Sequence, residues 1–214
     1  MTTAREDILG RIRSALGPGP PAGSAAQAEI PRAYRQAGDP VGFDPVEHFA
    51  ERVADYDAVV HRAAAGDLEA ALGAACRERG AARLAVPVGL PWSVEGVELV
   101  ADDPPLGPRD LDGMDGVLSG CAVAVAETGS IVLDGAGVSG RRALTLVPDL
   151  HLCVVRTEQV VPSVPDAIAA LAPAVEDGRP VVFVSGPSAT ADIELERVHG
   201  VHGPRTLEVF VVED

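Results

Sequence analysis

Hydroxyl, carboxylate and imidazole side chains gather in one short stretch near the C-terminus of this 214-residue chain. The apolar run 181–184 leads into Ser-Gly-Pro-Ser-Ala-Thr-Ala-Asp-Ile-Glu (185–194), and Gly-Val-His-Gly-Pro (200–204) follows shortly after. Ligands of α/β proteins usually bind at the carboxyl ends of strands. We therefore take Asp192 and His202 as candidate catalytic residues. The candidate ligand-binding residues of this stretch are Ser185, Gly186, Pro187, Ser188, Thr190, Glu194 and Gly203.

The same stretch also has a purely structural interpretation. Ser188 or Thr190 would cap a helix over 191–198, and Asp192 would lie in its first turn, where the helix dipole favours a carboxylate. The free backbone N–H groups at that helix start would equally bind an anion. Both roles need the same donors, so an occupied cap weakens the anion-binding interpretation.

A metal site is a third interpretation of this stretch, because Asp192, Glu194, His199 and His202 are all metal-ligating types. His199 and His202 are three residues apart, but Gly200 between them breaks regular helix geometry, and no established metal motif has this spacing. We therefore predict no metal site. His202 is expected to act as a neutral hydrogen-bonding group or as a proton carrier near neutral pH.

A second polar segment is the turn Ala-Glu-Thr-Gly-Ser (126–130) between two β-rich runs. Glu127 ends an apolar strand, where a carboxylate can have a raised pKa and act as a base or nucleophile. It would equally serve as a turn-stabilising acceptor for backbone N–H groups. The residues themselves leave these two roles of Glu127 open, and Thr128, Gly129 and Ser130 are the neighbouring ligand-binding candidates.

Gly-Ala-Gly-Val-Ser-Gly (135–140) fits the glycine pattern of dinucleotide-binding turns, and Glu158 lies at a suitable distance beyond it. The helix that it would open, over 141–147, ends at Pro148 and is too short for a βαβ crossover. We therefore favour a glycine-rich turn that leads into a short helix. Arg141 and Arg142 follow, and a guanidinium can bind a carboxylate or phosphate through two hydrogen bonds. We take Arg141 as a ligand-binding candidate and expect Arg142 to pair with surface carboxylates.

Composition excludes several classes of function. The net charge of −15 disfavours nucleic acid and anionic membranes as partners. The chain has no lysine, so it offers neither a Schiff-base nor a Walker A lysine. Any fixed positive charge in a site must therefore come from arginine. The three cysteines, Cys76, Cys121 and Cys153, are far apart, so we expect free thiols and no iron–sulfur or zinc site built by this chain.

The elements that must position these side chains follow an α/β order. An apolar stripe in 8–16 predicts an N-terminal helix, and the Gly-, Pro- and Ala-rich stretch that follows reads as a linker, which gives an arm over 1–31 and an α/β domain over 32–214. Helices are expected over 45–54, 67–79 and 166–175. Strands are expected over 58–60, 83–86, 97–100, 121–126, 130–133, 151–156, 181–184 and 206–212. This alternation predicts an open, mostly parallel sheet, and the lack of a long apolar run predicts a cytoplasmic protein.

Two motifs in fixed order, Ala-Glu-Thr-Gly-Ser-Ile-Val-Leu (126–133) and the pair 185–194 and 200–204, resemble the LUD-domain family over roughly 47–212. The resemblance implies the fold shared by CoA transferases, ribose-5-phosphate isomerase and glucosamine-6-phosphate deaminase. It also implies a subunit that works with iron–sulfur partner proteins to oxidise L-lactate to pyruvate, with no cofactor in this chain. It favours a functional role for Glu127.

The sequence leaves open whether such a subunit is catalytic, substrate-binding or structural. Oxidation of a small anionic 2-hydroxy acid needs a base for the hydroxyl and a cation for the carboxylate. Glu127 or His202 would supply the base and Arg141 the cation. The alternatives are a non-enzymatic assembly subunit and a stand-alone enzyme on a CoA- or sugar-phosphate-type substrate. We further expect the glutamate turn and the 185–202 region to converge on one cleft at the strand ends.

Overall fold

A computed structural model describes residues 3–17, 33–190, 198–199 and 203–213, and it divides the chain into two units, Met1–Tyr34 and Arg35–Asp214. The first unit contains helix α1 (Ala4–Leu16), which confirms the predicted N-terminal helix. The Thr3 hydroxyl accepts from the Glu6 N–H, and the Glu6 carboxylate accepts from the Thr3 N–H at 2.7 Å. This capping box satisfies two backbone donors that have no partner within the helix.

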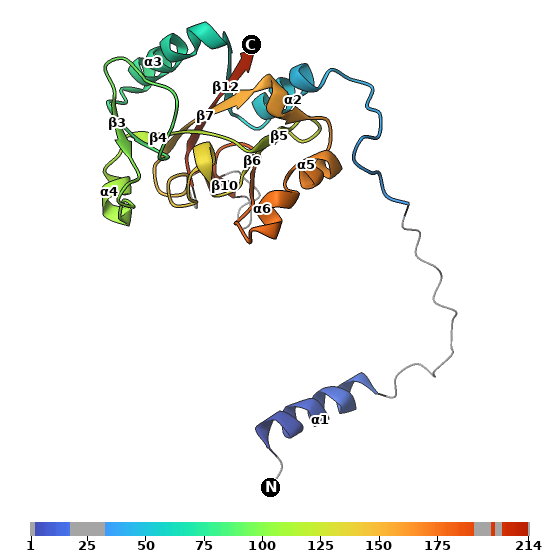
Figure 1. Cartoon of the computed structure of the whole chain (residues 1–214). Helices are drawn as coiled ribbons and strands as arrows, with labels where there is room; N and C mark the ends of the chain where they lie inside the picture. The colour runs from blue at the N-terminus through green and yellow to red at the C-terminus, as the bar shows by residue number, and fades with distance from the viewer. Residues whose placement is uncertain (1–2, 18–32, 191–197, 200–202, 214) are drawn as a thin grey trace. The chain divides into compact units, whose positions relative to one another are not determined.

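The second unit is built on a six-stranded, all-parallel sheet (Figure 1) with the strand order β1-β12-β7-β4-β2-β3. The predicted open, parallel α/β sheet is therefore present. Its central strands are apolar almost throughout, because a parallel sheet is covered on both faces. In sheet order the strands are β1 (Val59–Ala64), β12 (Thr206–Glu213), β7 (Leu150–Arg156), β4 (Gly116–Gly120), β2 (Arg83–Val86) and β3 (Glu98–Ala101).

A second, four-stranded mixed sheet has the order β8-β5-β6-β9 and was not predicted from the sequence. Its β5–β6 hairpin pairs the two β-rich runs that the sequence predicts on either side of the glutamate turn, and the turn contains Gly129 at a φ of +60°. A Cβ on Gly129 would lie 2.6 Å from the Arg52 carbonyl carbon, so only glycine fits there. The strands are β8 (Val160–Val161), β5 (Val123–Val125), β6 (Ser130–Leu133) and β9 (Val182–Val184).

The two sheets pack face to face, and helices cover their outer faces (Figure 1). The core between the sheets takes Cys153, Val155 and Val209 from the large sheet and Ala124 and Ile131 from the small one. Helix α3 (Leu68–Arg79) packs on the outer face of the large sheet, and α5 (Val164–Ala170), which α6 (Ala172–Glu176) follows, packs on the outer face of the small one. Helix α2 (Pro45–Ala54) contributes Phe49 and Val53 to the core between the sheets, and α4 (Pro108–Asp112) contributes Leu111 to a cluster with Ala85 and Val117. The helix predicted over 166–175 is two helices, because Pro173 lacks the N–H that would continue the first.

Two loop regions can be compared with the sequence predictions. The glycine-rich turn expected over 135–140 is present, whereas residues 141–149 form turns and bends in place of the short helix expected over 141–147. Residues 135–140 form a glycine-rich turn that contains only the 3₁₀ helix η2 (Gly137–Ser139), so no dinucleotide-binding βαβ unit starts there. Short strands β10 (Ala189–Thr190) and β11 (Val198–His199) pair antiparallel. Of the helix predicted over 191–198, residues 191–197 lie outside the described part of the chain, and Val198 belongs to a strand. The remaining 3₁₀ helices are η1 (Ala65–Asp67) and η3 (Thr157–Gln159).

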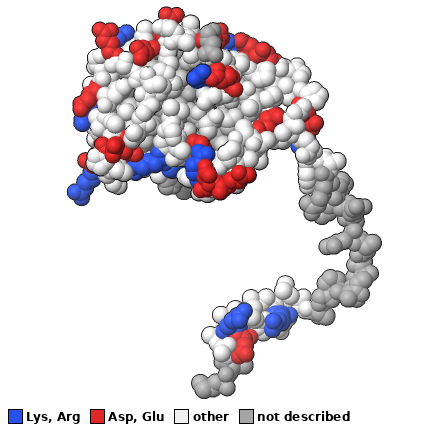
Figure 2. All heavy atoms as spheres, viewed as in Figure 1, with Lys and Arg blue, Asp and Glu red and all other residues white. Residues whose placement is uncertain are grey.

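Acidic side chains are spread over the visible face of the second unit, in line with the net charge of −15 (Figure 2). None of the helices in the described residues is both long and apolar enough to cross a membrane. The same residues contain no group of three His, Cys, Asp or Glu side chains that is arranged to hold a metal ion.

Candidate functional site

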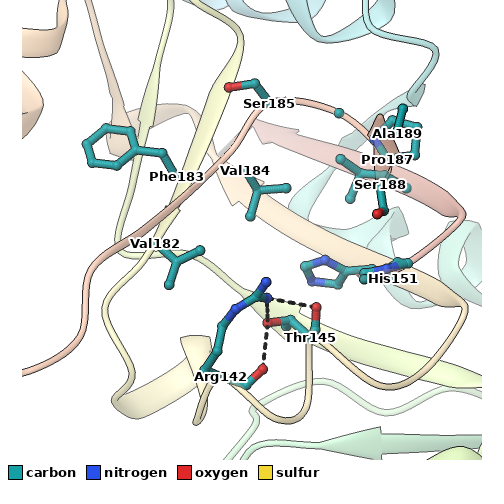
Figure 3. Close-up of a pocket in the computed structure, with 14 residues that line it drawn as sticks. Arg142, Thr145, His151, Val182, Phe183, Val184, Ser185, Pro187, Ser188 and Ala189 are labelled. Carbon is teal, nitrogen blue, oxygen red and sulfur yellow. Dashed lines mark hydrogen bonds between the residues drawn. The ribbon is translucent and has the colours of Figure 1, made fainter. Parts of the chain in front are cut away.

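A cavity of about 400 Å³ lies where the two sheets meet (Figure 3). Its lining comes from the loop before β7, the first residues of β7 and β12, and β9 with the loop that follows it. The cavity therefore lies at the carboxyl end of β9, next to the polar stretch singled out in the sequence, but at the amino ends of the central strands of the parallel sheet. The lining residues are Arg142, Thr145, His151, Val182–Ala189, Gly203, Pro204 and Leu207.

Arg142 is the cation of this cavity. Its Nη1 donates to the Thr145 carbonyl at 2.9 Å and to the Thr145 hydroxyl at 3.1 Å, which fixes the guanidinium (Figure 3). Desolvation lowers the pKa of Arg142. Within the described part of the chain no carboxylate lies within ion-pair distance of it, so the expected surface ion pair is not formed there. A half-buried cation that has no counter-ion among the described residues favours an anionic ligand.

His151 is the second polar group of the cavity wall and is only 1% exposed. Its Nε2 lies 2.8 Å from the Ser119 hydroxyl on the neighbouring strand β4. Two residues along β7, Cys153 lies on the same face of the sheet. A hydrogen bond with Cys121 lowers the pKa of the Cys153 thiol to about 5, burial opposes this, and His151 and Ser119 add to the lowering. All three cysteines are free thiols, as predicted, and all three are buried.

Ser185 and the glutamate turn are joined by a chain of hydroxyl groups. Ser185 Oγ lies 2.6 Å from Ser130 Oγ, which lies 2.8 Å from Thr128 Oγ1. Gly186, at a φ of +100°, packs so closely on the end of α2 that a Cβ would lie 2.7 Å from the Tyr56 carbonyl oxygen. The two predicted segments are therefore neighbours, held together by hydrogen bonds and by glycine contacts with the chain at the end of α2.

Glu127 itself does not line the cavity. It forms an ion pair with Arg35 and lies in a separate hollow of about 350 Å³ that Thr128, Arg52, Asp55 and Tyr56 also line. The expected single cleft is thus two hollows, one on each side of the hydroxyl chain.

Arg141 is held by structural partners. Its Nε and Nη2 bind the Asp102 carboxylate at 2.5 and 2.8 Å, and Nη2 also donates to the Leu106 carbonyl. Burial would raise the pKa of Asp102, but hydrogen bonds from Arg141 and the Leu106 N–H together lower it. In the described part of the chain, the arginine that faces the cavity is Arg142, because adjacent residues in this loop point to different partners.

Other predicted site residues are placed as follows. Pro187, Ser188 and Gly203 line the cavity, and the Ser188 N–H donates to the Pro204 carbonyl at 2.8 Å. Ser130 is buried within the hydroxyl chain. The side chain of Thr190 and the residues Asp192, Glu194 and His202 lie outside the described part of the structure.

The LUD domain matches residues 108–212, which include every described residue that lines the cavity. A protein named Lactate utilization protein C from Deinococcus radiodurans is 42% identical over 214 residues, which cover 99% of this chain and 93% of that protein. The chain belongs to the LUD-domain family. The family predicted from the two sequence motifs is thereby confirmed.

Two further similarities cover different shares of this LUD-domain chain. A Lactate utilization protein C from Geobacillus kaustophilus is 33% identical over 130 residues, which cover 58% of this chain and 54% of that protein. The crystal structure of a DUF162 family protein from Deinococcus radiodurans matches with a TM-score of 0.69 at 41% identity, and covers 78% of this chain and 96% of that one. The solved structure supports the two-sheet α/β architecture.

Arg142, Thr145 and His151 were not predicted as site residues of this LUD domain. His151 lies within the apolar strand Leu-His-Leu-Cys-Val-Val-Arg (150–156). The available signal was a titratable side chain within a strand that is buried on both faces. Such a side chain needs a buried hydrogen-bond partner or a ligand. The absence of lysine already restricted the site's cation to arginine.

Proposed function

We propose that this chain acts in lactate utilisation, as a subunit of a system that oxidises L-lactate to pyruvate together with iron–sulfur partner proteins. The name and the near full-length similarity of the Deinococcus radiodurans relative support the process. The cavity between the sheets would bind the small 2-hydroxy acid through its carboxylate. At a finer level, we assign the fold to the group that includes the CoA transferases, an assignment that rests on the family.

The proposed binding of a carboxylate in the cavity depends on Arg142. Thr145 holds only Nη1 of its guanidinium, and in the described part of the chain Nε and Nη2 bond to no protein atom. These two N–H groups form the edge that binds a carboxylate through two parallel hydrogen bonds. The apolar side chains of Val182, Val184 and Leu207 also line the cavity, and a less polar environment would strengthen that interaction.

The cysteines of this chain do not fit an iron–sulfur cluster, which needs several thiolates around one centre. Cys121 and Cys153 are neighbours between the two sheets, whereas Cys76 packs on the opposite face of the large sheet. The electrons removed from the substrate would therefore pass to partner subunits. This division of labour explains why a cluster-free chain would belong to a redox system.

The test uses the complex purified through a tagged copy of this chain in its native host. We compare the wild type, Arg142→Gln, and the matched control Arg109→Gln, which changes an exposed arginine outside the cavity. All three should retain iron–sulfur partners. Arg142→Gln should raise the KM for L-lactate by at least about tenfold, the effect of losing a hydrogen bond to a charged group, and the control should match the wild type.

Each opposite result has a definite meaning. If Arg142→Gln matches the control in lactate oxidation, the carboxylate site is wrong and a non-enzymatic assembly role is favoured. If no iron–sulfur protein accompanies the wild-type chain, the place in a lactate-oxidising complex is wrong.

A further inference from the structure

The pair formed by Ser119 and His151 determines which imidazole nitrogen carries a proton. Both side chains lie on the face of the large sheet that is turned toward the small sheet, and both are almost fully buried, at 0% and 1% exposed. Ser119 Oγ is 2.8 Å from His151 Nε2 and 3.0 Å from the Gly120 carbonyl oxygen. The Ser119 hydroxyl thus has one proton and two neighbouring atoms that could accept it.

A proton count gives the tautomer of His151. A carbonyl oxygen only accepts hydrogen bonds, so the contact with Gly120 is satisfied only when the Ser119 hydroxyl donates to it. Ser119 Oγ then accepts from His151, and Nε2 carries the imidazole proton. In the neutral ring Nδ1 is left with a lone pair and acts as an acceptor only. This assignment comes from heavy-atom positions and the hydrogen-bond network.

The acceptor nitrogen of His151 can contact a ligand, because His151 forms part of the cavity wall. Nε2 is turned to Ser119, which does not line the cavity, so Nδ1 is the nitrogen available to a ligand. Figure 3 shows the His151 ring grouped with the Arg142 guanidinium and Thr145 on one side of the cavity, across from Val182 and Val184. A carboxylate and a hydroxyl on adjacent carbons would meet these two groups together.

We propose that His151 makes this cavity selective for 2-hydroxy acids over 2-oxo acids, because its Nδ1 accepts a hydrogen bond from the C2 hydroxyl while Arg142 holds the carboxylate. The inference rests on the proposed function of the same cavity. A hydroxyl donates to the nitrogen lone pair. A keto oxygen has no proton to give, so its lone pairs would face another lone pair and both polar atoms would stay unpaired. Sites built for a hydrogen bond reject analogues that cannot form it.

The experiment measures binding of three acids to the purified full-length chain at pH 8 by calorimetry. L-Lactate carries the hydroxyl, pyruvate the keto oxygen, and propionate neither. We expect L-lactate to bind at least about tenfold more tightly than pyruvate. His151→Phe should reduce L-lactate to the level of propionate and leave propionate unchanged, because Arg142 still holds the carboxylate.

Ser119→Ala tests the tautomer without touching the cavity wall. It removes the acceptor of Nε2, so the imidazole proton is free to move to Nδ1, and the preference for L-lactate over pyruvate should fall toward one. Ser93→Ala, a surface serine bonded to Glu69, is the matched control and should keep the wild-type ratio. The ¹⁵N chemical shifts of His151 report the tautomer directly, independent of any ligand.

The outcomes separate this inference from the proposed function. Equal affinities of the wild type for L-lactate and pyruvate, a ratio that Ser119→Ala leaves unchanged, or a proton observed on Nδ1 would each overturn the selectivity. Binding of all three acids that Arg142→Gln does not weaken would overturn the carboxylate site instead. No binding of any acid by the folded chain would overturn both.

Discussion

The contact between Gly129 and helix α2 predicts a large loss of stability for Gly129→Ala. The residue has a φ of +60°, and an added Cβ would lie 2.6 Å from the Arg52 carbonyl carbon and 2.7 Å from the Val53 nitrogen. An L-residue in the left-handed region costs about 1–2 kcal/mol. The clash is with backbone atoms, so relief requires helix α2 to move, and overpacking of this kind costs about 1–3 kcal/mol.

Together these effects predict a free energy of unfolding that is lower by about 2–5 kcal/mol. In a chain of this size the melting temperature should then fall by roughly 4–20 °C. Thermal and urea unfolding followed by circular dichroism measure both quantities. The variant should also move the hydroxyl chain, because Ser130 follows the substituted residue directly.

Two other glycines separate the steric clash from the backbone strain. Gly178 has a φ of +68° with no atom within 4 Å of a Cβ, so Gly178→Ala should show the strain alone, about 1–2 kcal/mol. Gly66 has neither a positive φ nor a close neighbour, and Gly66→Ala should be neutral or slightly stabilising. If Gly129→Ala destabilises no more than Gly178→Ala, the close approach of the turn to α2 is wrong.

Three further predictions concern other parts of the chain. Asp102→Asn should lower the unfolding free energy by about 1–3 kcal/mol at pH 7, because Arg141 loses its charged partner. The pKa of Asp102 is lowered in the folded state, so this contribution is present above the ordinary carboxyl range and is lost as pH falls through the folded pKa. Urea titrations of both proteins from pH 7 downward should therefore show a difference that narrows as the pH falls. Ser130→Ala breaks the middle of the hydroxyl chain and should cost about 1–2 kcal/mol in urea unfolding, whereas an unchanged midpoint would mean that the chain adds no stability. The chain purified without partners should contain no stoichiometric iron or acid-labile sulfide. Finding both by chemical assay would contradict the prediction that its three buried cysteines hold no iron–sulfur cluster.

The elements that the sequence predicted well are those set by local signals. Asp44 and Pro45 mark the start of α2, Gly80 ends α3 with a left-handed conformation, and the β5–β6 hairpin follows from its turn. Strand β4 was missed because Gly-Val-Leu-Ser-Gly is short and contains two glycines, which are depleted in strands. The division into two sheets was also missed, because pairing of β9 with β6 joins residues about 50 positions apart and no local pattern encodes it.

The site was predicted in part, for a related reason. The segment after β9 was expected to line a ligand site, and its described part lines the cavity. Which of two adjacent arginines faces that cavity depends on Asp102, which lies 39 positions before Arg141 and holds it. The surroundings of His151 depend on Ser119, from another strand. Long-range contacts such as these decide whether a residue has a structural or a functional role. The spacing of residues along the chain does not reveal such contacts.

The hydroxyls of Thr128, Ser130 and Ser185 form a row in which every member can both give and receive a proton. Such a row has two collective orientations, and turning one hydroxyl over turns its neighbours as well. In one orientation Ser185 directs its hydrogen at Ser130 and offers a lone pair to the cavity; in the other it offers the hydrogen. A change of charge in the hollow beside Thr128 would favour one of these two orientations, and with it one polarity at Ser185. Thr128→Val would remove that control and leave the cavity wall intact.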